Sequence, residues 1–414
     1  MATLAAPHTD IRPAGWSEKS NQEKLMKCHF RHPMLIALLC CSSVFAADKI
    51  KIGFISSLSG SGGALGVDIR DGFQLALTNG NNKLGGLPVE LSVLDDQMNP
   101  DIGRQASERL IKRDHVDVMT GMVFSNVLLP LLPAILESDT VYISTNTGPA
   151  DYAGEKCNKN FFVISWQNED LPGAMGKYVT QQNEQNVFLI GANYPGGRES
   201  IAGFKRHYKG KIADEVYVKL GQLDFSAELA QARVSKADSV FFFLPGAMGS
   251  AFLKQMDSGG LNKTMRIYAP GFSGDQDSIK AVGEPMLGMY NASQWASDLD
   301  NAENAKFVRA FEKQYGRIPT MYAAQGYDAA LLLDGAVRDV KGHIEDKTAF
   351  RKALRAANFK SVRGDFKFNR NHYPIHNIHM RVVERDKQGR ISNRTVGMIA
   401  KDYSDPYAVN CKMD

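Results

Sequence analysis

The sequence predicts an α/β protein of two similar lobes, each a parallel sheet covered by helices, and three observations support this fold class. At 414 residues the chain is longer than one hydrophobic core usually covers. Short apolar runs rich in β-branched residues alternate with stretches of helical periodicity, as in βαβ units. This alternation occurs twice, through residues 50–165 and again through residues 187–290.

The first 46 residues read as an export signal with an upstream extension. Lys24, Lys27 and Arg31 precede the apolar stretch PMLIALLCCSSV, and small residues follow it up to Ala46. A positive flank, a short apolar stretch and a small-residue cleavage site characterise secretory signals, and this stretch is too short to cross a bilayer stably. We expect cleavage near Ala46 and a periplasmic mature protein. A buried N-terminal helix is the alternative, and the long upstream region leaves the true start codon open.

The first lobe is expected over residues 47–166 and 293–366. Its strands are predicted at KIKIGFIS, VELSVLDD, VDVMTG, TVYIST and FFVISW, and its first helices near residues 67–80, 101–114 and 126–138. Further helices are predicted near residues 303–315, 321–340 and 346–356. Because no strand separates these last three, they must cover a sheet that is already built, so the chain is expected to return to the first lobe.

The second lobe is expected over residues 167–292 and 367–414. Its strands are predicted at NVFLIGA, EVYVKL, SVFFFLP and MRIYAP, and its helices near residues 170–183, 198–209, 226–236 and 247–258. The segment GDFKFNRNHYPIHNIHMRVVERDKQGRISNRTVGMI has the alternation of a strand pair turned at residues 386–389. No low-complexity linker separates the lobes, which favours close crossovers and a hinge.

Charge and cysteine content narrow the functional classes. The 49 basic residues exceed the 45 acidic ones by only four and are scattered, so a nucleic-acid partner is not expected. Cys28, Cys40 and Cys41 would leave with the signal, so that Cys157 and Cys411 remain. In an oxidising compartment we expect these two to form a disulfide; two buried free thiols are the alternative.

The sequence offers no constellation typical of an enzyme or a cofactor site. The glycines of LSGSGGALG, residues 58–66, are spaced G-x-G-x-x-x-G and lack an acidic residue at the distance typical of dinucleotide sites. The sequence GFSGD at residues 271–275 is not a nucleophile elbow. His372, His376 and His379 do not have the spacing that would bring them together in a strand. We therefore expect no catalytic residue, no cofactor and no metal.

Turns rich in hydroxyls and amides follow the predicted strands. In doubly wound sheets ligands bind at the carboxyl ends of strands, where helix N-termini point backbone donors into a crevice. Ser125 opens the helix after VDVMTGMVF, and Thr147 lies in the turn after TVYIS. Both can donate to a carboxylate, so the sequence predicts a site for a small organic anion.

From Lys49 onwards the chain resembles the Leu/Ile/Val-binding class of periplasmic solute-binding proteins that feed ABC importers. The resemblance is carried by IKIGFISSLSGSGGALGVDIRDGFQLAL, VLDDQMNP, TGMVFSN, ISTNTGPA, FFVISWQNED, DFSAELAQARVSKADSVFFFLPG and YAAQGYDAALLL. It implies the type I periplasmic binding protein fold, in which two Rossmann-like lobes with parallel sheets are joined by a three-strand hinge. It also implies closure on a small ligand and delivery to a membrane permease.

The resemblance also implies a set of ligand-binding positions in the two lobes. Carried over position by position, these are Leu65, Phe124, Ser125, Asn146, Thr147, Tyr194, Gly246, Ala247, Gly271, Phe272 and Tyr322. Members that bind an α-amino acid hold its ammonium through an acidic residue and a tyrosine; here Gly271 or Phe272 replaces the acid and Gly246 replaces the tyrosine. Asp275 can substitute only if its turn folds inward.

A buried ammonium without a carboxylate nearby is costly, so the sequence favours a carboxylate ligand without an amine. In this respect the chain resembles the branch of the family that binds aromatic acids, which implies a ligand of the benzoate or hydroxycinnamate type. The leading hypothesis is thus a non-enzymatic, extracytoplasmic substrate-binding protein of an ABC transporter. The alternatives are a binding protein for branched-chain or other hydrophobic amino acids, a sensory ligand-binding module and an exported α/β hydrolase.

Overall fold

Two sheets organise residues 47–413, the part of the chain that the computed structural model describes. Helices cover both sheets, and these residues together form one compact unit. The predicted export signal, residues 1–46, lies outside the described residues. Within the described part, none of the helices is long and apolar enough to cross a membrane.

The first sheet has the strand order β2-β3-β1-β4-β5-β6 and is parallel except for the short pair β2–β3. Its strands are β1 (Ile50–Ser56), β2 (Lys83–Leu84), β3 (Leu87–Asp95), β4 (Val118–Thr120), β5 (Val141–Ser144) and β6 (Phe161–Val163). Nearly every residue of β1, β4, β5 and β6 is buried. Such continuous burial is typical of parallel strands that are covered on both faces.

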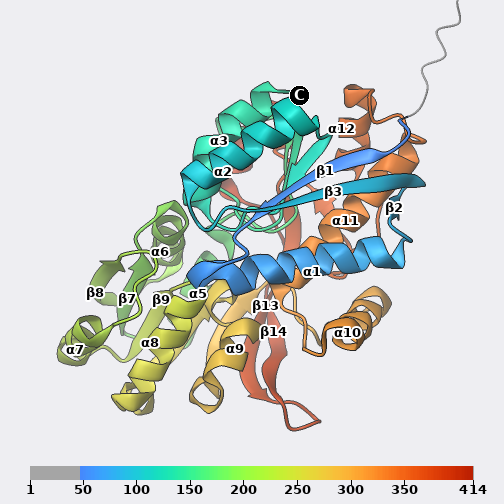
Figure 1. Ribbon diagram of the computed structural model, residues 1–414. Helices are drawn as coiled ribbons and strands as arrows, with labels where there is room; N and C mark the ends of the chain where they lie inside the picture. Colours follow the sequence, from blue (N-terminus) through green and yellow to red (C-terminus); the bar gives the residue numbers. More distant parts are fainter. Residues whose placement is uncertain (1–46, 414) are drawn as a thin grey trace, which may run out of the picture. The chain divides into compact units, whose positions relative to one another are not determined.

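Helices from two distant parts of the sequence cover this first sheet. They are α1 (Gly63–Asn79), α2 (Pro100–Arg109), α3 (Ser125–Glu137), α4 (Ala150–Ala153), α10 (Ala302–Tyr315), α11 (Met321–Asp339) and α12 (Lys347–Ala356). Figure 1 shows α1 on one side of β1 and β3, with α2 and α3 on the other. A Cβ atom added at Gly72 of α1 would lie 1.9 Å from the Ala323 carbonyl oxygen of α11. Glycine therefore lets α11 pack closely along α1, and the chain returns to the first lobe as predicted.

The second sheet is mixed, because the C-terminal strand pair joins the parallel strands that the sequence predicted. Its strands are β7 (Asn186–Ala192), β8 (Lys211–Val218), β9 (Ser239–Phe243), β10 (Arg266–Pro270), β11 (Tyr290–Ser293), β12 (Lys367–Phe368), β13 (Pro374–Arg385) and β14 (Ile391–Tyr403). The first five are parallel, in the order β11-β10-β9-β7-β8, and β13 joins β11 antiparallel. The predicted strand pair is confirmed as the antiparallel hairpin β13–β14.

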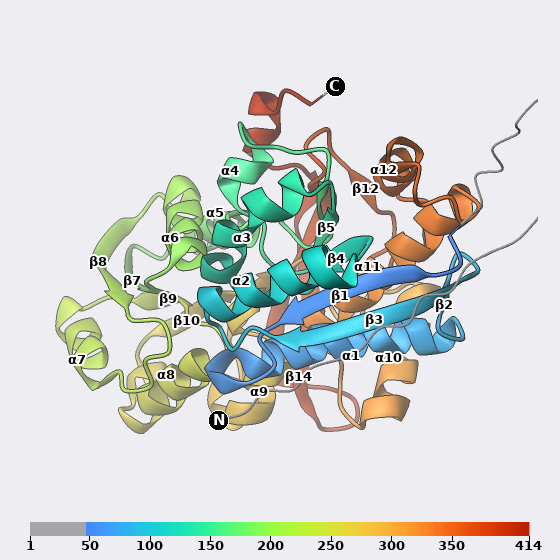
Figure 2. The same ribbon diagram turned by 45° about the horizontal axis from the view of Figure 1, so that its top comes forward.

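Five helices accompany the second sheet: α5 (Asp170–Gln181), α6 (Pro195–His207), α7 (Ser226–Ser235), α8 (Ala247–Ser258) and α9 (Gln276–Val282). Figure 2 shows α6 beside β7, β8 and β9, with α8 beyond their other side. The chain passes between the two sheets three times: between β6 and α5, between β11 and α10, and between α12 and β12. These passages give the two-lobed, hinged arrangement that was expected. The residue boundaries of the lobes stay a prediction.

A disulfide joins Cys157 to Cys411, as predicted, with the two Cα atoms 5.6 Å apart. It closes a loop with a sequence separation of 254 residues. Near it, the turn at Pro406–Asn410 packs beside α4, as Figure 2 shows at the C-terminal end of the chain. The disulfide thus ties the tail that follows the second sheet to the loop before β6 in the first.

Candidate functional site

A narrow cavity lies between the lobes, at the carboxyl ends of strands from both sheets. Its wall consists of Leu65, Val123, Phe124, Ser125, Asn146, Thr147, Trp166, Asn168, Tyr194, Gly196, Phe243, Pro245, Phe272 and Tyr322. Eight residues that the sequence singled out are therefore brought together: Leu65, Phe124, Ser125, Asn146, Thr147, Tyr194, Phe272 and Tyr322. Gly246, Ala247 and Gly271 are not part of the wall, although Gly246 adjoins Pro245 and Gly271 adjoins Phe272.

Six wall residues did not appear among the sequence candidates. They are Val123, Trp166, Asn168, Gly196, Phe243 and Pro245. A signal for two of them was present: Phe243 ends β9 and Pro245 follows it, and the carboxyl ends of parallel strands are where ligands gather. Trp166 and Asn168 come from the passage between β6 and α5, which has no periodicity to mark it.

The glycine-rich turn contributes Leu65 to the wall, but its glycines serve a different purpose. A Cβ atom at Gly62 would lie 2.5 Å from the Phe124 ring, and one at Gly66 would lie 2.0 Å from the Ser57 carbonyl oxygen. Asp95 accepts the Leu58 backbone N–H at 2.8 Å and so holds the turn from outside. The glycines therefore make room for neighbouring groups, and Asp95 has a structural role in holding the turn.

Hydroxyl and amide groups form one end of the cavity. The Ser125 and Thr147 hydroxyl oxygens are 2.8 Å apart, and the Asn168 amide nitrogen is 3.5 Å from Ser125 Oγ. The Ser144 hydroxyl donates to the Thr147 carbonyl at 2.5 Å, and the Asn146 side chain donates to the Val123 carbonyl at 2.6 Å. These bonds fix the turns after β4 and β5 to each other, so the donors at this end are preorganised.

Two of the helices that begin at the cavity, α3 and α6, lack side-chain caps. No side chain accepts the first backbone N–H groups of α3, which follows Phe124, or of α6, which follows Tyr194. By contrast, Asn99, Asn301 and Asp346 cap α2, α10 and α12 with their side chains. The N-terminus of a helix favours negative charge, so the uncapped ends of α3 and α6 are suited to an anion.

Aromatic side chains form much of the remaining wall of the cavity, in an unbroken series of neighbours. The ring centroids are 4.2 Å apart for Trp166 and Phe272, 5.4 Å for Phe272 and Phe243, 6.1 Å for Phe243 and Tyr194, and 6.0 Å for Tyr194 and Phe124. Such rings offer faces and edges to another ring at these separations. Burial raises the pKa of Tyr194, so its phenol stays protonated and can donate a hydrogen bond.

The cavity is small and its wall carries no formal charge. Its volume is about 20 Å³, enough for one water molecule. A ring can therefore enter only if the walls move apart, which the hinge between the lobes permits. The Tyr322 hydroxyl donates to the Phe272 carbonyl at 2.9 Å, so at least one hydrogen bond links α11 to the second lobe beside the cavity.

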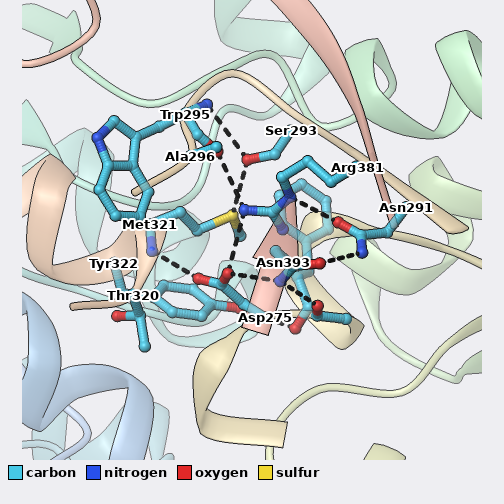
Figure 3. A network of polar contacts seen from close by, with 12 residues as sticks. Asp275, Asn291, Ser293, Trp295, Ala296, Thr320, Met321, Tyr322, Arg381 and Asn393 are labelled. Atoms are coloured by element: carbon cyan, nitrogen blue, oxygen red, sulfur yellow. Dashed lines mark hydrogen bonds and ion pairs between the residues drawn. The ribbon is translucent and has the colours of Figure 1, made fainter. Parts of the chain in front are cut away.

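Asp275 does not turn into the cavity, so it cannot supply the acid that an ammonium requires. Figure 3 shows its carboxylate facing the buried Arg381 guanidinium, 3.1 Å away. The same carboxylate accepts the Met321 backbone N–H at 2.5 Å. Arg381 also donates to the Asn291 side chain at 2.8 Å and to the Trp295 carbonyl at 3.0 Å. Asp275 is thus committed to a buried network behind the cavity wall.

No group of histidine, cysteine and acidic residues is arranged to hold a metal ion among residues 47–413. His376 and His379 lie in β13, and His372 lies in the turn before it. Burial lowers the pKa of His376 to about 3, so it stays neutral inside the fold.

Two α/β lobes joined by three passages, with a polar and aromatic cavity between them, define a hinged solute-binding protein. Residues 49–390 match the periplasmic binding protein family, and the chain belongs to it. The family resemblance seen in the sequence is thereby confirmed, and the fold and family are those of substrate-binding proteins.

Individual relatives are distant in sequence but cover most of the chain. The Leu/Ile/Val-binding protein homolog 6 of Brucella abortus (strain 2308) is 22% identical over 379 residues, which cover 88% of this chain and 95% of that protein. An ABC-transporter solute-binding protein from R. palustris, solved in complex with benzoate, is 29% identical with a TM-score of 0.84, covering 88% of this chain and 99% of that one.

A third relative is the ABC-transporter solute-binding protein from Rhodopseudomonas palustris BisB5, solved in complex with 3,4-dihydroxybenzoic acid. It is 25% identical with a TM-score of 0.80, and the match covers 87% of this chain and 99% of that one. The chain is therefore a solute-binding protein of the ABC-transporter type.

Proposed function

We propose that this protein captures a small aromatic monocarboxylic acid of the benzoate or hydroxycinnamate type. The observation that carries the proposal is the composition of the cavity wall, which combines neutral donors with aromatic rings and contains no acidic side chain. The carboxylate would be held by Ser125, Thr147 and Asn168. The two solved relatives that contain benzoate and 3,4-dihydroxybenzoic acid support the same ligand class.

Hydrogen bonds to a charged partner contribute about 1.5–3 kcal/mol each, so several converging donors can offset the desolvation of one carboxylate. The lobes would close over the acid by rotation about the three passages, and the closed shape would be recognised by membrane permease subunits. The function requires no catalytic step. Gly246, Ala247 and Gly271 are retained as contacts of a ligand that reaches beyond Phe272 and Pro245.

Export belongs to the same proposal. Family members are periplasmic binding proteins, and the first 46 residues have the composition of a signal with a cleavage site near Ala46. We expect N-terminal sequencing of the mature protein to begin near Ala47; an intact N-terminus on protein recovered from the periplasm would contradict the cleavage site.

A branched-chain amino acid is the second candidate ligand, because a curated relative is a Leu/Ile/Val-binding protein homolog. An α-amino acid would bring an ammonium group into a wall without a carboxylate, since Asp275 is paired with Arg381. Leaving that charge without a partner is costly. The aromatic acid therefore fits this wall better.

The test combines a ligand screen with a pair of double variants. Benzoate, 4-hydroxybenzoate, 4-hydroxycinnamate and leucine are compared by thermal shift, and the dissociation constant is measured by calorimetry. Ser125→Ala with Thr147→Ala removes two donors, so we expect binding of the best acid to weaken by at least about a hundredfold.

The matched control uses a second hydroxyl pair near the far end of α3. Ser138 and Thr140 have hydroxyl oxygens 2.8 Å apart, but they lie outside the cavity wall. Ser138→Ala with Thr140→Ala should leave the dissociation constant unchanged. A clear leucine response with none from the acids, or unchanged binding after loss of Ser125 and Thr147 hydroxyls, would refute the proposal.

A further inference from the structure

Glu199 lies directly behind the neutral donors of the cavity. It belongs to α6, and its two carboxylate oxygens accept hydrogen bonds from separate segments. Oε2 accepts from the Asn168 amide at 2.6 Å, and Oε1 accepts from the Ala150 backbone N–H at 3.3 Å. Asn168 Oδ1 accepts the Gly148 backbone N–H at 2.8 Å. This last bond fixes which way the Asn168 amide points, so its nitrogen faces Glu199 and Ser125.

The contacts form a continuous chain from Glu199 to the proposed carboxylate site. Asn168 Nδ2 contacts Glu199 on one side and lies 3.5 Å from Ser125 Oγ on the other, and Ser125 is hydrogen-bonded to Thr147. A ligand carboxylate on these hydroxyls would therefore be separated from the Glu199 carboxylate by about one side chain. Two like charges so close in a partly buried cleft repel each other strongly.

The surroundings of Glu199 supply no compensating cation. The titratable groups that face it are acids and phenols, namely Glu169, Asp151, Tyr194 and Tyr373. The nearby basic side chains are already paired, Arg206 with Glu169 at 2.6 Å and Lys156 with Asp151 at 2.7 Å. Arg198, the preceding residue, lies over the Tyr217 ring. Of the ion pairs formed by residues 47–413, none includes Glu199.

We propose that Glu199 is a positioning residue of the anion site, and that capture of the acid is accompanied by uptake of one proton from solvent onto its carboxyl group. Protonated Glu199 keeps one oxygen free to accept the Asn168 amide, so the donor stays oriented while the like charge disappears. The proton returns to solvent when the acid is released. This inference rests on the proposed function, because it takes a carboxylate ligand as given.

Glu199 titrates in a pH range in which proton uptake on ligand binding can be measured. Burial raises the pKa of Glu199 to about 7, although the bonds from Asn168 and Ala150 act in the opposite direction. An anion in the cavity raises that pKa further. The affinity for the acid is then highest below about pH 7. Above that pH the affinity falls, by a factor that approaches about ten for each pH unit. Benzoate titrates near pH 4 and is ionised throughout, so its own titration does not contribute.

The experiment is calorimetric titration of the mature protein with benzoate and with 4-hydroxybenzoate between about pH 6 and pH 8.5. Each titration is run in two buffers of different ionisation enthalpy, which yields the number of protons taken up. For the wild type we expect uptake approaching one proton and a dissociation constant at least about fivefold larger at the high end of this range.

Three variants separate positioning from charge. Glu199→Gln keeps an acceptor for Asn168 without a charge, so it should bind at every pH as the wild type does at low pH, with no proton uptake. Glu199→Ala removes one of the two bonds that hold the Asn168 amide, leaving only the one from Gly148, and should weaken binding about tenfold even at low pH. Glu169→Gln removes a neighbouring carboxylate that raises the pKa of Glu199 and contacts Arg206 and Tyr407, so it should keep the proton uptake but move the fall in affinity to lower pH.

The possible outcomes distinguish failure of the role proposed for Glu199 from failure of the proposed function. Binding of benzoate with a constant affinity and no proton uptake overturns the role of Glu199 and leaves the proposed function standing. The same holds if Glu199→Gln keeps the wild-type pH profile. Failure of the wild type to bind either acid at low pH overturns the proposed function and this inference with it.

Discussion

The buried pair of Arg381 and Asp275 provides a quantitative test of how the cavity wall is supported (Figure 3). Arg381 is 0% exposed and makes hydrogen bonds to Asn291 and Trp295 in addition to the pair. Asp275 in turn accepts the Met321 N–H at the start of α11, so it connects the second sheet to a helix of the first lobe. Loss of the cation should therefore affect the packing of both lobes.

Arg381→Met keeps much of the side-chain length but removes the charge and the donors. Asp275 is then a buried carboxylate without its countercharge, and breaking a buried pair from one side costs about 3–5 kcal/mol. Asp275→Asn should also destabilise the protein. The double variant should be less destabilised than the sum of the two single variants, by about 2 kcal/mol or more, since it leaves no isolated charge.

The assay is urea unfolding of the mature protein followed by tryptophan fluorescence. Arg394→Met serves as the matched control, because Arg394 forms an exposed ion pair with Glu384 on the same strand pair, and such pairs contribute about 0–1 kcal/mol. A loss from Arg381→Met no larger than the control, or simple additivity in the double variant, would refute the reasoning. Asp275→Asn should leave the preference for aromatic acids unchanged, because Asp275 lies outside the wall.

Two further predictions concern stability. Replacing both Cys157 and Cys411 with serine opens a loop of 254 residues, so the free energy of unfolding measured by urea titration should fall by up to about 5 kcal/mol. The ligand dissociation constant should stay unchanged. Equal unfolding midpoints of variant and wild type would contradict this prediction. Burial raises the pKa of Asp170 to about 8, above its value in the unfolded chain, so its contribution to stability is complete below about pH 4 and is lost as the pH rises through 8. The thermal midpoint should therefore fall more steeply from pH 5 to pH 9 in the wild type than in Asp170→Asn, and parallel curves would exclude the effect.

The sequence predicted the fold well because the apolar periodicity that marks a strand or a helix involves only neighbouring residues. The return of α11 to the first lobe, for example, follows from three successive helices without a strand between them. The antiparallel pairing of β13 with β11 was not predicted, since alternation reveals a strand but not its neighbour. The candidate site was partly predictable for a similar reason: Ser125 and Thr147 follow recognisable strands.

Other parts of the site depend on contacts between distant segments. The Trp166 ring packs against the Phe272 ring in a tilted arrangement, and Asp275 meets Arg381 from a position 106 residues earlier in the chain. The sequence left open whether Asp275 faces the ligand, because the answer depends on which strand supplies the arginine. Likewise, nothing in the sequence marks Glu199 as part of the site, because it is a single acidic residue on a helix. Its importance comes from the Asn168 amide, which a different segment supplies.

The uncharged wall also affects how the ligand is released from the cavity. A carboxylate held only by hydroxyl, amide and backbone donors can exchange each of those bonds for one to water as soon as the cleft is wetted. No ion pair has to be pulled apart first. Under the proposed function, residence time would then be set by how often the lobes part, so a transporter that merely spreads them would empty the binding protein without displacing its cargo by force.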